Sequence, residues 1–334
     1  MRIVKPAYYD TFRCLAGACP DTCCKDWDIL VDEESAEFYR TLPGELGERV
    51  RRALTEEDGE TILLFENGRC PLCREDGLCS IQAQLGHDAL CRTCQEFPRL
   101  THDYGTFLER GLELSCPEAA RIVLTAPAEP IVQEEVPGGD EPEYDLEAME
   151  QLLRSRQVMR QILSDRSRPV QQVLVLALMY GYQAQAELDG AEVQEFDPEA
   201  ALEEAAGLAH PGSAAAILDF LKELDILTER WRIRLDAPDP APWTEPHLAL
   251  MRYFVDRYWL QAVSDYDLVS RVKLGIVSTL TVRILGGDPI STAQLYSKEI
   301  ENSAENVDAL LDGAYTAPAF TDDKLLGLLL AEEI

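Results

Sequence analysis

The ten cysteines of this 334-residue chain all lie between positions 14 and 116. Four of them fall within eleven residues, in the run Cys14-Leu-Ala-Gly-Ala-Cys19-Pro-Asp-Thr-Cys23-Cys24. The other six are Cys70, Cys73, Cys79, Cys91, Cys94 and Cys116. Such segregation predicts a thiol site that one domain builds by itself and does not share with the rest of the chain.

The charge of the chain restricts its partners. There are 61 acidic and 30 basic side chains, which gives a net charge of −31. An acidic surface of this kind repels nucleic-acid phosphate and anionic lipid, so we expect neither nucleic acid nor membrane as a partner. It attracts basic protein surfaces that present lysines, although acidity can also serve solubility alone.

The compartment follows from the termini and the cysteine usage. No apolar signal segment follows Met1, and the longest apolar run, Val173 to Tyr180, is too short to span a bilayer. We therefore expect a cytoplasmic protein. In a reducing compartment, clustered cysteines bind metal or carry redox chemistry more often than they form disulfides, although the even count leaves a disulfide framework open.

The first third of the chain mixes helices and strands. Helices are predicted from Asp32 to the Pro43-Gly44 break and again from Glu45 to Leu54. The runs Thr61 to Phe65 and 106–114 are β-prone. A short helix is expected from Ser80, and another begins at Cys116-Pro117, because proline favours the first helical position.

A composition change marks the domain boundary. Ala126 to Asp145 is rich in proline, glycine and acidic residues and contains no lysine or arginine, which is typical of an exposed linker. Apolar residues beyond it recur at helical spacing. The predicted fold is mostly α, with a small cysteine-rich, metal-binding α+β domain over 1–125, a linker over 126–143 and an all-helical domain over 144–334.

The cysteine spacing predicts metal binding. Three pairs have chelating separations, and these are Cys19-x3-Cys23, Cys70-x2-Cys73 and Cys91-x2-Cys94. Zinc usually takes two such pairs, whereas iron–sulfur clusters typically take three close thiolates and one distant thiolate, so spacing leaves both open. A thioredoxin-like site is disfavoured because neither CxxC lies in a visible βαβ unit. His87 and His102 are weaker ligand candidates, for which ordinary solvent-facing roles are expected.

Several blocks resemble the flagellin lysine-N-methylase (FliB) family. The resemblance rests on the run from Tyr9 and Phe12-Arg-Cys14 to Trp27, on Cys70-Pro-Leu with Gly77-Leu-Cys79-Ser-Ile-Gln, on Cys94-Gln-Glu-Phe-Pro-Arg99 and on Leu114-Ser-Cys116-Pro-Glu118. These blocks also resemble a wider group of zinc- or iron-chelating cysteine domains. The matching motifs cover about a third of the chain and occur in the same order.

The resemblance implies methyl transfer from S-adenosylmethionine to surface lysines of flagellin or another protein, with a 4Fe-4S cluster, or alternatively zinc, held by the cysteine-rich domain. Cys73 and Cys91 each complete a CxxC that the family pattern does not require. The implied metal ligands are the shared thiols Cys14, Cys19, Cys23, Cys24, Cys70, Cys79, Cys94 and Cys116.

Catalytic and substrate-binding residues are harder to identify. A lysine must lose its proton before it attacks a methyl group, and a carboxylate or tyrosine in a desolvated pocket would help. Tyr8, Tyr9, Tyr104 and Glu109 are conceivable bases, but none is assigned. Three aromatic residues of the helical domain could hold substrate or cofactor, although helical core is the expected role, and these are Tyr253, Tyr258 and Trp259.

Two functions therefore compete. One is an S-adenosylmethionine-dependent lysine methyltransferase whose cysteine domain holds an iron–sulfur cluster. The other is a non-catalytic zinc-binding or metal-handling interaction protein. Iron with acid-labile sulfide, or zinc without sulfide, would discriminate them.

Overall fold

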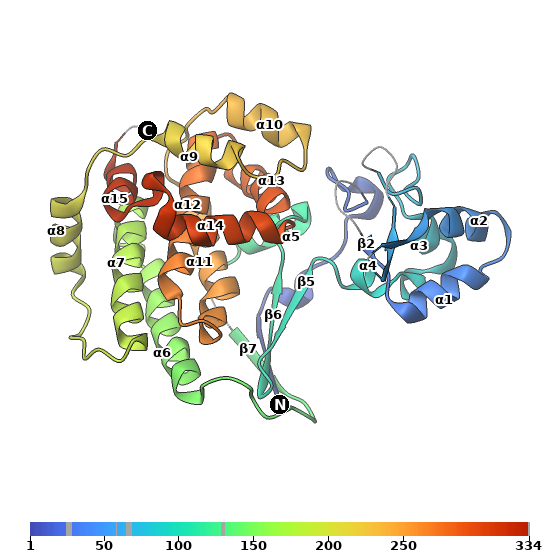
Figure 1. Ribbon diagram of the computed structural model, residues 1–334, viewed down its shortest axis with the longest axis horizontal. Coiled ribbons are helices and arrows are strands. Elements are labelled where there is room, and N and C mark those ends of the chain that lie inside the picture. Colours follow the sequence, from blue (N-terminus) through green and yellow to red (C-terminus); the bar gives the residue numbers. More distant parts are fainter. Residues whose placement is uncertain (25–28, 58, 65–68, 128–130, 333–334) are drawn as a thin grey trace.

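The chain folds around two separate hydrophobic cores. The computed structural model describes residues 1–24, 29–57, 59–64, 69–127 and 131–332. One core is built from residues between Ile29 and Cys94, which we call the small lobe. The other takes its residues from both sides of that segment, from Tyr9 and Phe12 and then from Tyr104 onwards, and we call it the helical body. Figure 1 shows the small lobe beside the body, joined to it by extended chain.

The small lobe combines short helices with a three-stranded sheet. Asp32 caps α1 (Glu33–Thr41) by accepting from the backbone N of Ser35, and α2 (Gly44–Ala53) follows directly. The strand order is β2-β4-β3, all antiparallel. The strands are β2 (Ile29–Leu30), β3 (Leu54–Glu57) and β4 (Glu60–Leu63), and the later helices are α3 (Ser80–Leu85) and α4 (Arg92–Glu96).

A four-stranded sheet with order β5-β6-β1-β7 lies along one side of the helical body. Its strands are β1 (Arg2–Pro6), β5 (Arg99–Asp103), β6 (Phe107–Leu112) and β7 (Ile131–Glu135). β1 pairs in parallel with β6 and antiparallel with β7. The start of the chain is thus held between two segments that come more than one hundred residues later.

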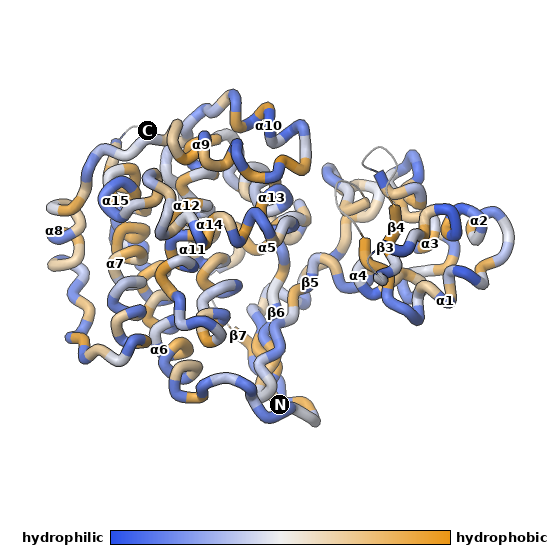
Figure 2. Tube along the Cα trace, in the orientation of Figure 1, coloured by the Kyte–Doolittle hydropathy of each residue, from blue (hydrophilic) through white to orange (hydrophobic). Residues whose placement is uncertain are grey.

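The helical body is built around α12. Every residue of that helix is buried, because α7, α11 and α14 pack around it. Figure 2 shows the long hydrophobic stretch of α7 that faces this packing. The helices are α5 (Pro117–Thr125), α6 (Leu146–Leu163), α7 (Val170–Leu188), α8 (Pro198–Leu208), α9 (Ala214–Lys222), α10 (Glu229–Asp236), α11 (Glu245–Tyr258), α12 (Leu268–Leu285), α13 (Pro289–Ile300), α14 (Ala304–Thr316) and α15 (Asp322–Leu330).

The prediction of a mostly α protein is confirmed, with the strands confined to residues before Val136. The strand predicted over Thr61 to Phe65 is present as β4, and Phe65 lies outside the described residues. Metal binding by the first domain stays a prediction. No helix in the described part of the chain is both long and apolar enough to cross a membrane.

The segment predicted as a linker contains a strand. Ile131–Glu135 forms β7, because the free edge of β1 offers its backbone groups to this stretch. Pro130, one of the prolines that suggested the linker, lies outside the described residues. The division of the chain into domains at 125 and 143 stays a prediction, but the hydrophobic cores divide it differently, at about Ile29 and Cys94.

A buried ion pair ties the sheet to the helices. Arg156 on α6 lies 2.8 Å from Glu109 on β6, and the two side chains are 3% and 10% exposed. Arg154, two residues earlier, makes a similar pair with Glu150, but both of those side chains are exposed to solvent.

Arg156→Ala should therefore destabilise the fold by about 3–5 kcal/mol, because it leaves a buried carboxylate without its cation. Arg154→Ala is the matched control on the same helix and should change the free energy of unfolding by about 0.5 kcal/mol or less. Urea unfolding followed by helical circular dichroism measures both. Equal losses from the two variants would contradict this account.

Candidate functional site

A cavity of about 260 Å³ lies where the small lobe meets the helical body. All eight cysteines predicted as metal ligands line it, and so does Cys91. Cys73 is not among its lining residues. The structure thus brings together thiols that lie as much as 102 residues apart in the sequence, and these are Cys14, Cys19, Cys23, Cys24, Cys70, Cys79, Cys91, Cys94 and Cys116.

The cysteine-rich loop that follows β1 crosses between the two cores. It makes a single 3-10 turn, Ala16–Ala18, between the first two thiols. Gly17 in this turn lies so close to the backbone of the small lobe that an added Cβ would come within 3.0 Å of the carbonyl oxygen of Asp76. A larger residue there would need the Asp76 carbonyl to move by a few tenths of an ångström, so glycine favours the close passage of the loop past the turn that ends at Leu78. Trp27, expected to shield the site, lies outside the described residues.

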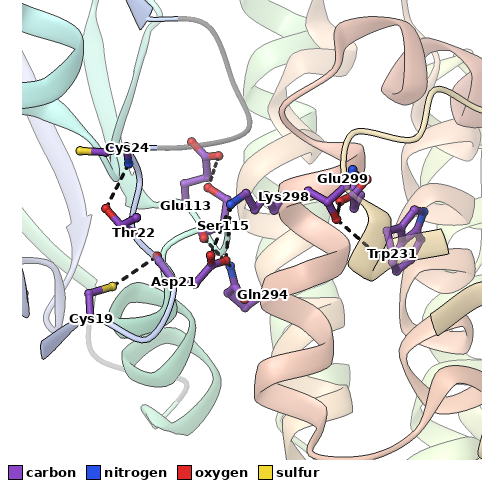
Figure 3. A network of polar contacts seen from close by, with 11 residues as sticks. Cys19, Asp21, Thr22, Cys24, Glu113, Ser115, Trp231, Gln294, Lys298 and Glu299 are labelled. Atoms are coloured by element: carbon purple, nitrogen blue, oxygen red, sulfur yellow. Dashed lines mark hydrogen bonds and ion pairs between the residues drawn. The ribbon is translucent and has the colours of Figure 1, made fainter. Parts of the chain in front are cut away.

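Asp21 fixes this loop to helix α13. Its side chain is buried and accepts a hydrogen bond of 3.0 Å from Nε2 of Gln294, which also donates to the backbone oxygen of Ser115 at 2.8 Å. Lys298, one turn further along α13, lies 3.5 Å from both carboxylate oxygens of Asp21. On the other side, the Cys19 thiol donates to the backbone oxygen of Asp21. Figure 3 shows Gln294 and Lys298 pointing from α13 toward the loop.

The expectation that one domain builds the thiol site alone is therefore wrong. Cys116 begins α5 and belongs to the core of the helical body, and Lys298 and Asn302 line the cavity from the far end of the chain. Sequence reasoning missed these residues because Lys298 has no cysteine near it in the sequence. The sequence holds no signal for them, because only the packing of α13 buries Gln294 and Lys298 against the loop.

Burial raises the pKa of several of these thiols. It raises the pKa of Cys116 to about 11 and the pKa of Cys70 to about 12, because the thiolate form loses its hydration. A hydrogen bond between the side chains of Cys91 and Cys94 lowers the pKa of Cys91 and raises that of Cys94. All ten cysteines are free thiols in this structure.

The donor set suits a thiophilic metal. Soft thiolate sulfur selects zinc, copper(I) and iron–sulfur clusters over hard cations such as magnesium. Within the described residues, however, no three His, Cys, Asp or Glu side chains converge closely enough to hold one ion. The residues therefore fit such a group by their chemistry and by their gathering around one cavity, and their sulfur atoms would still have to turn toward it.

The conceivable bases lie elsewhere. Glu109 and Tyr8 line a second, smaller cavity of about 40 Å³ beside the four-stranded sheet. Glu109 is already engaged by Arg156, and Tyr9 and Tyr104 are buried in the core of the body. None of these four residues lines the thiol cavity.

The two candidate histidines line different cavities, and the three aromatic residues near the middle of the helical domain lie in its core. His87 lines the thiol cavity, whereas His102 lines the smaller one. The three aromatic residues considered for substrate or cofactor binding are buried in the helical body, as their helical-core interpretation expected. They are Tyr253 and Tyr258, which donate hydrogen bonds to Glu301, and Trp259, which donates to the backbone oxygen of Leu152.

The fold and the cavity define a class of cysteine-rich protein in which thiols line a cavity between a small lobe and an α-helical body. Comparison with known proteins identifies the family within that class. The chain is 33% identical over 138 residues to the flagellar biosynthetic protein FliU of Salmonella muenchen, a match that covers 37% of this chain and 78% of FliU. The same identity over the same length relates it to the lysine-N-methylases of Salmonella typhimurium and Salmonella choleraesuis, and these matches span 33% of each relative.

The chain belongs to the flagellin lysine-N-methylase family. It matches only about a third of the length of the two lysine-N-methylases. No family model matches the sequence, and no solved structure matches it.

Removing the side-chain amide of Gln294 should loosen the cysteine-rich loop that this amide holds. Gln294→Ala deletes the two hydrogen bonds to Asp21 and Ser115, and leaving such buried acceptors unsatisfied costs about 1–3 kcal/mol. Amides of 19–24 should then exchange with deuterium roughly tenfold faster or more. Gln183→Ala, which removes an exposed side-chain bond to the Gln194 backbone, is the control and should leave those amides unchanged. Unchanged exchange in Gln294→Ala would show that α13 does not hold the loop.

Proposed function

We propose that this protein transfers a methyl group from S-adenosylmethionine to the ε-amino group of a lysine on flagellin. The observation that carries the proposal is the gathering of family-matching thiols around one cavity, in a chain related to proteins named lysine-N-methylase. The chain spans about a third of the length of those proteins, and the proposal applies their named activity to it.

The cavity offers the surfaces that such a reaction needs. Phe12 and Phe97 supply aromatic walls on which an adenine ring can pack. Arg13, Arg99 and Lys298 supply positive charge that suits the carboxylate of the methionine portion. Both kinds of side chain face the same space, as binding of one amphipathic cofactor requires.

The reaction itself is balanced without a further reactant. A carbon–nitrogen bond forms between the methyl group and the lysine nitrogen as the carbon–sulfur bond of the sulfonium breaks. S-adenosylhomocysteine leaves, and the amine loses one proton. A desolvated cavity lowers the pKa of an entering lysine, which raises the fraction of the neutral, nucleophilic amine.

The net charge of −31 supports a lysine-rich partner. Long-range attraction between an acidic protein and a basic surface raises the rate of encounter and falls as salt is added. Nucleic acid is disfavoured by the same charge.

A 4Fe-4S cluster is the group that the family resemblance implies, and its ligands would come from Cys14, Cys19, Cys23, Cys24, Cys70, Cys79, Cys94 and Cys116. When bound, such a cluster supplies electron-transfer capacity or an open iron that can ligate substrate atoms. The chain's own contribution is to exclude water, through the apolar side chains around the thiols, and to fix the cysteine-rich loop through Asp21.

A second candidate function is a zinc-binding interaction protein without catalytic activity. The pairs Cys70-x2-Cys73 and Cys91-x2-Cys94 favour it, because both have the spacing of zinc ligands. Metal content separates the two functions.

The test is methyl transfer by the full chain purified without oxygen. We expect about four iron and four sulfide per chain and transfer of isotope-labelled methyl groups to flagellin lysines, located by peptide mass spectrometry. Cys116→Ser should lower both iron content and methylation by about tenfold or more, since it removes a thiolate from the cavity.

Flagellin with acetylated lysines is the control substrate and should accept no methyl group. Zinc without sulfide, together with no transfer to flagellin, would overturn the proposed enzyme and favour the interaction protein. Iron–sulfur protein that transfers no methyl group would overturn the reaction alone.

A further inference from the structure

Four cysteines of the small lobe and its entry are linked through their backbones. The backbone N of Cys70 donates to the oxygen of Cys24 at 2.9 Å, and the backbone N of Cys73 donates to the oxygen of Cys70 at 3.0 Å. Cys73 and Cys79 pair as an isolated antiparallel bridge. Each of the four is thus a backbone neighbour of the next, and we call Cys24, Cys70, Cys73 and Cys79 the knuckle set.

The side chains of the knuckle set also meet. Those of Cys24 and Cys73 are hydrogen-bonded to each other, and Nη2 of Arg69 donates to the Cys73 sulfur at 3.3 Å. All four cysteines lie in the core of the small lobe or pack against it. The hairpin that carries Cys73 and Cys79 is closed by the hydrogen bonds from Arg74 to Leu78 and from Ser80 to Leu72.

A different group of thiols faces the helical body. Cys14, Cys19 and Cys23 lie on the loop that Asp21 fixes to α13, and Cys116 begins α5. In sequence this group has three close cysteines and one distant cysteine, which is the usual spacing for an iron–sulfur cluster. We call Cys14, Cys19, Cys23 and Cys116 the junction set.

We infer that the knuckle set is a tetrathiolate site for a zinc-type divalent cation, separate from the junction set that serves the cluster of the proposed function. The assignment gives Cys73, which the family pattern does not require and which does not line the cavity, a role as a ligand. It also assigns the adjacent Cys23 and Cys24, whose side chains are hydrogen-bonded to each other, to two neighbouring centres. The inference rests on the proposed function only for the identity of the group at the junction set.

The four sulfurs of the knuckle set lie in or against the apolar core of the small lobe. Four thiolates placed there need a cation beside them. A divalent cation supplies the missing charge and displaces the protons. Because the backbones already lie side by side, convergence to about 2.3 Å from a metal is a matter of side-chain rotation.

Cys91 and Cys94 belong to neither set. Their side chains are hydrogen-bonded to each other at the start of α4, and Cys91 is almost completely buried. Cys91→Ser is therefore a matched control, since it removes a buried thiol of the same lobe that belongs to neither set.

The test is metal analysis of the full chain purified without oxygen from medium that contains both iron and zinc. The wild type should hold about one zinc in addition to iron. Cys73→Ser/Cys79→Ser should lose the zinc and keep the iron, whereas Cys14→Ser/Cys19→Ser should lose the iron and keep the zinc. Cys91→Ser should keep both metals, and circular dichroism checks that every variant retains its helices.

Alkylation of the wild type tests the same grouping without substitutions. Metal-free protein is titrated with zinc alone, and the thiols that escape iodoacetamide are identified by mass spectrometry. The first equivalent should protect Cys24, Cys70, Cys73 and Cys79 together and leave Cys14 and Cys19 reactive.

The inference is overturned if both double variants lose the same metal, or if the first zinc protects thiols from the two sets alike. The inference does not depend on the methyltransferase reaction. If the protein binds two zinc ions and each double variant loses a different one, the two centres are still defined. Methylation activity plays no part in either readout.

Discussion

The structure depends on the anchoring of one short loop between two cores. Residues 13–24 run from the helical body into the small lobe. Asp21 is the buried carboxylate that holds them to α13. Because Cys14, Cys19 and Cys23 have no regular strand or long helix of their own, their positions depend on this contact and on the packing of Gly17 against the small lobe. A buried carboxylate, a lysine and an amide thus set the positions of thiols on the opposite side of the loop.

The same interface explains why the thiol cavity combines an apolar lining with charged side chains. A carboxylate and an ammonium that are both buried must face each other, since each would otherwise lose hydration without compensation. Asp21 and Lys298 do so across the interface between the loop and α13. The remaining lining combines sulfur and hydrocarbon with the cationic side chains of Arg13 and Arg99, so a charged group that enters the cavity meets both apolar walls and fixed charge.

Much of the fold follows from local sequence signals. The cap at Asp32, the proline at the start of α5 and the periodic apolar residues after Leu146 each predicted a helix that the structure contains. The strands β1 and β7 were missed, because each is short and is stabilised by partners far away in the chain. The spacing of the cysteines predicted that they would gather, and nine of them line one cavity. Lys298 and Gln294 could not be predicted, because only the packing of α13 on α5 brings them to the loop.

The division of the cysteines between two cores has an energetic reason. The small lobe runs only from Ile29 to Cys94, and a unit below about 70–80 residues rarely buries enough apolar surface to be stable by itself. Its three-stranded sheet has strands of two to four residues, which adds little. A metal held by thiolates of the lobe would supply the missing stabilisation, because metal binding that occurs only in the folded state is folding free energy. The helical body has no such need, since α12 is buried along its whole length. If the knuckle set binds a cation, the cysteines inside the lobe hold it together, and the cysteines at the junction are left for chemistry.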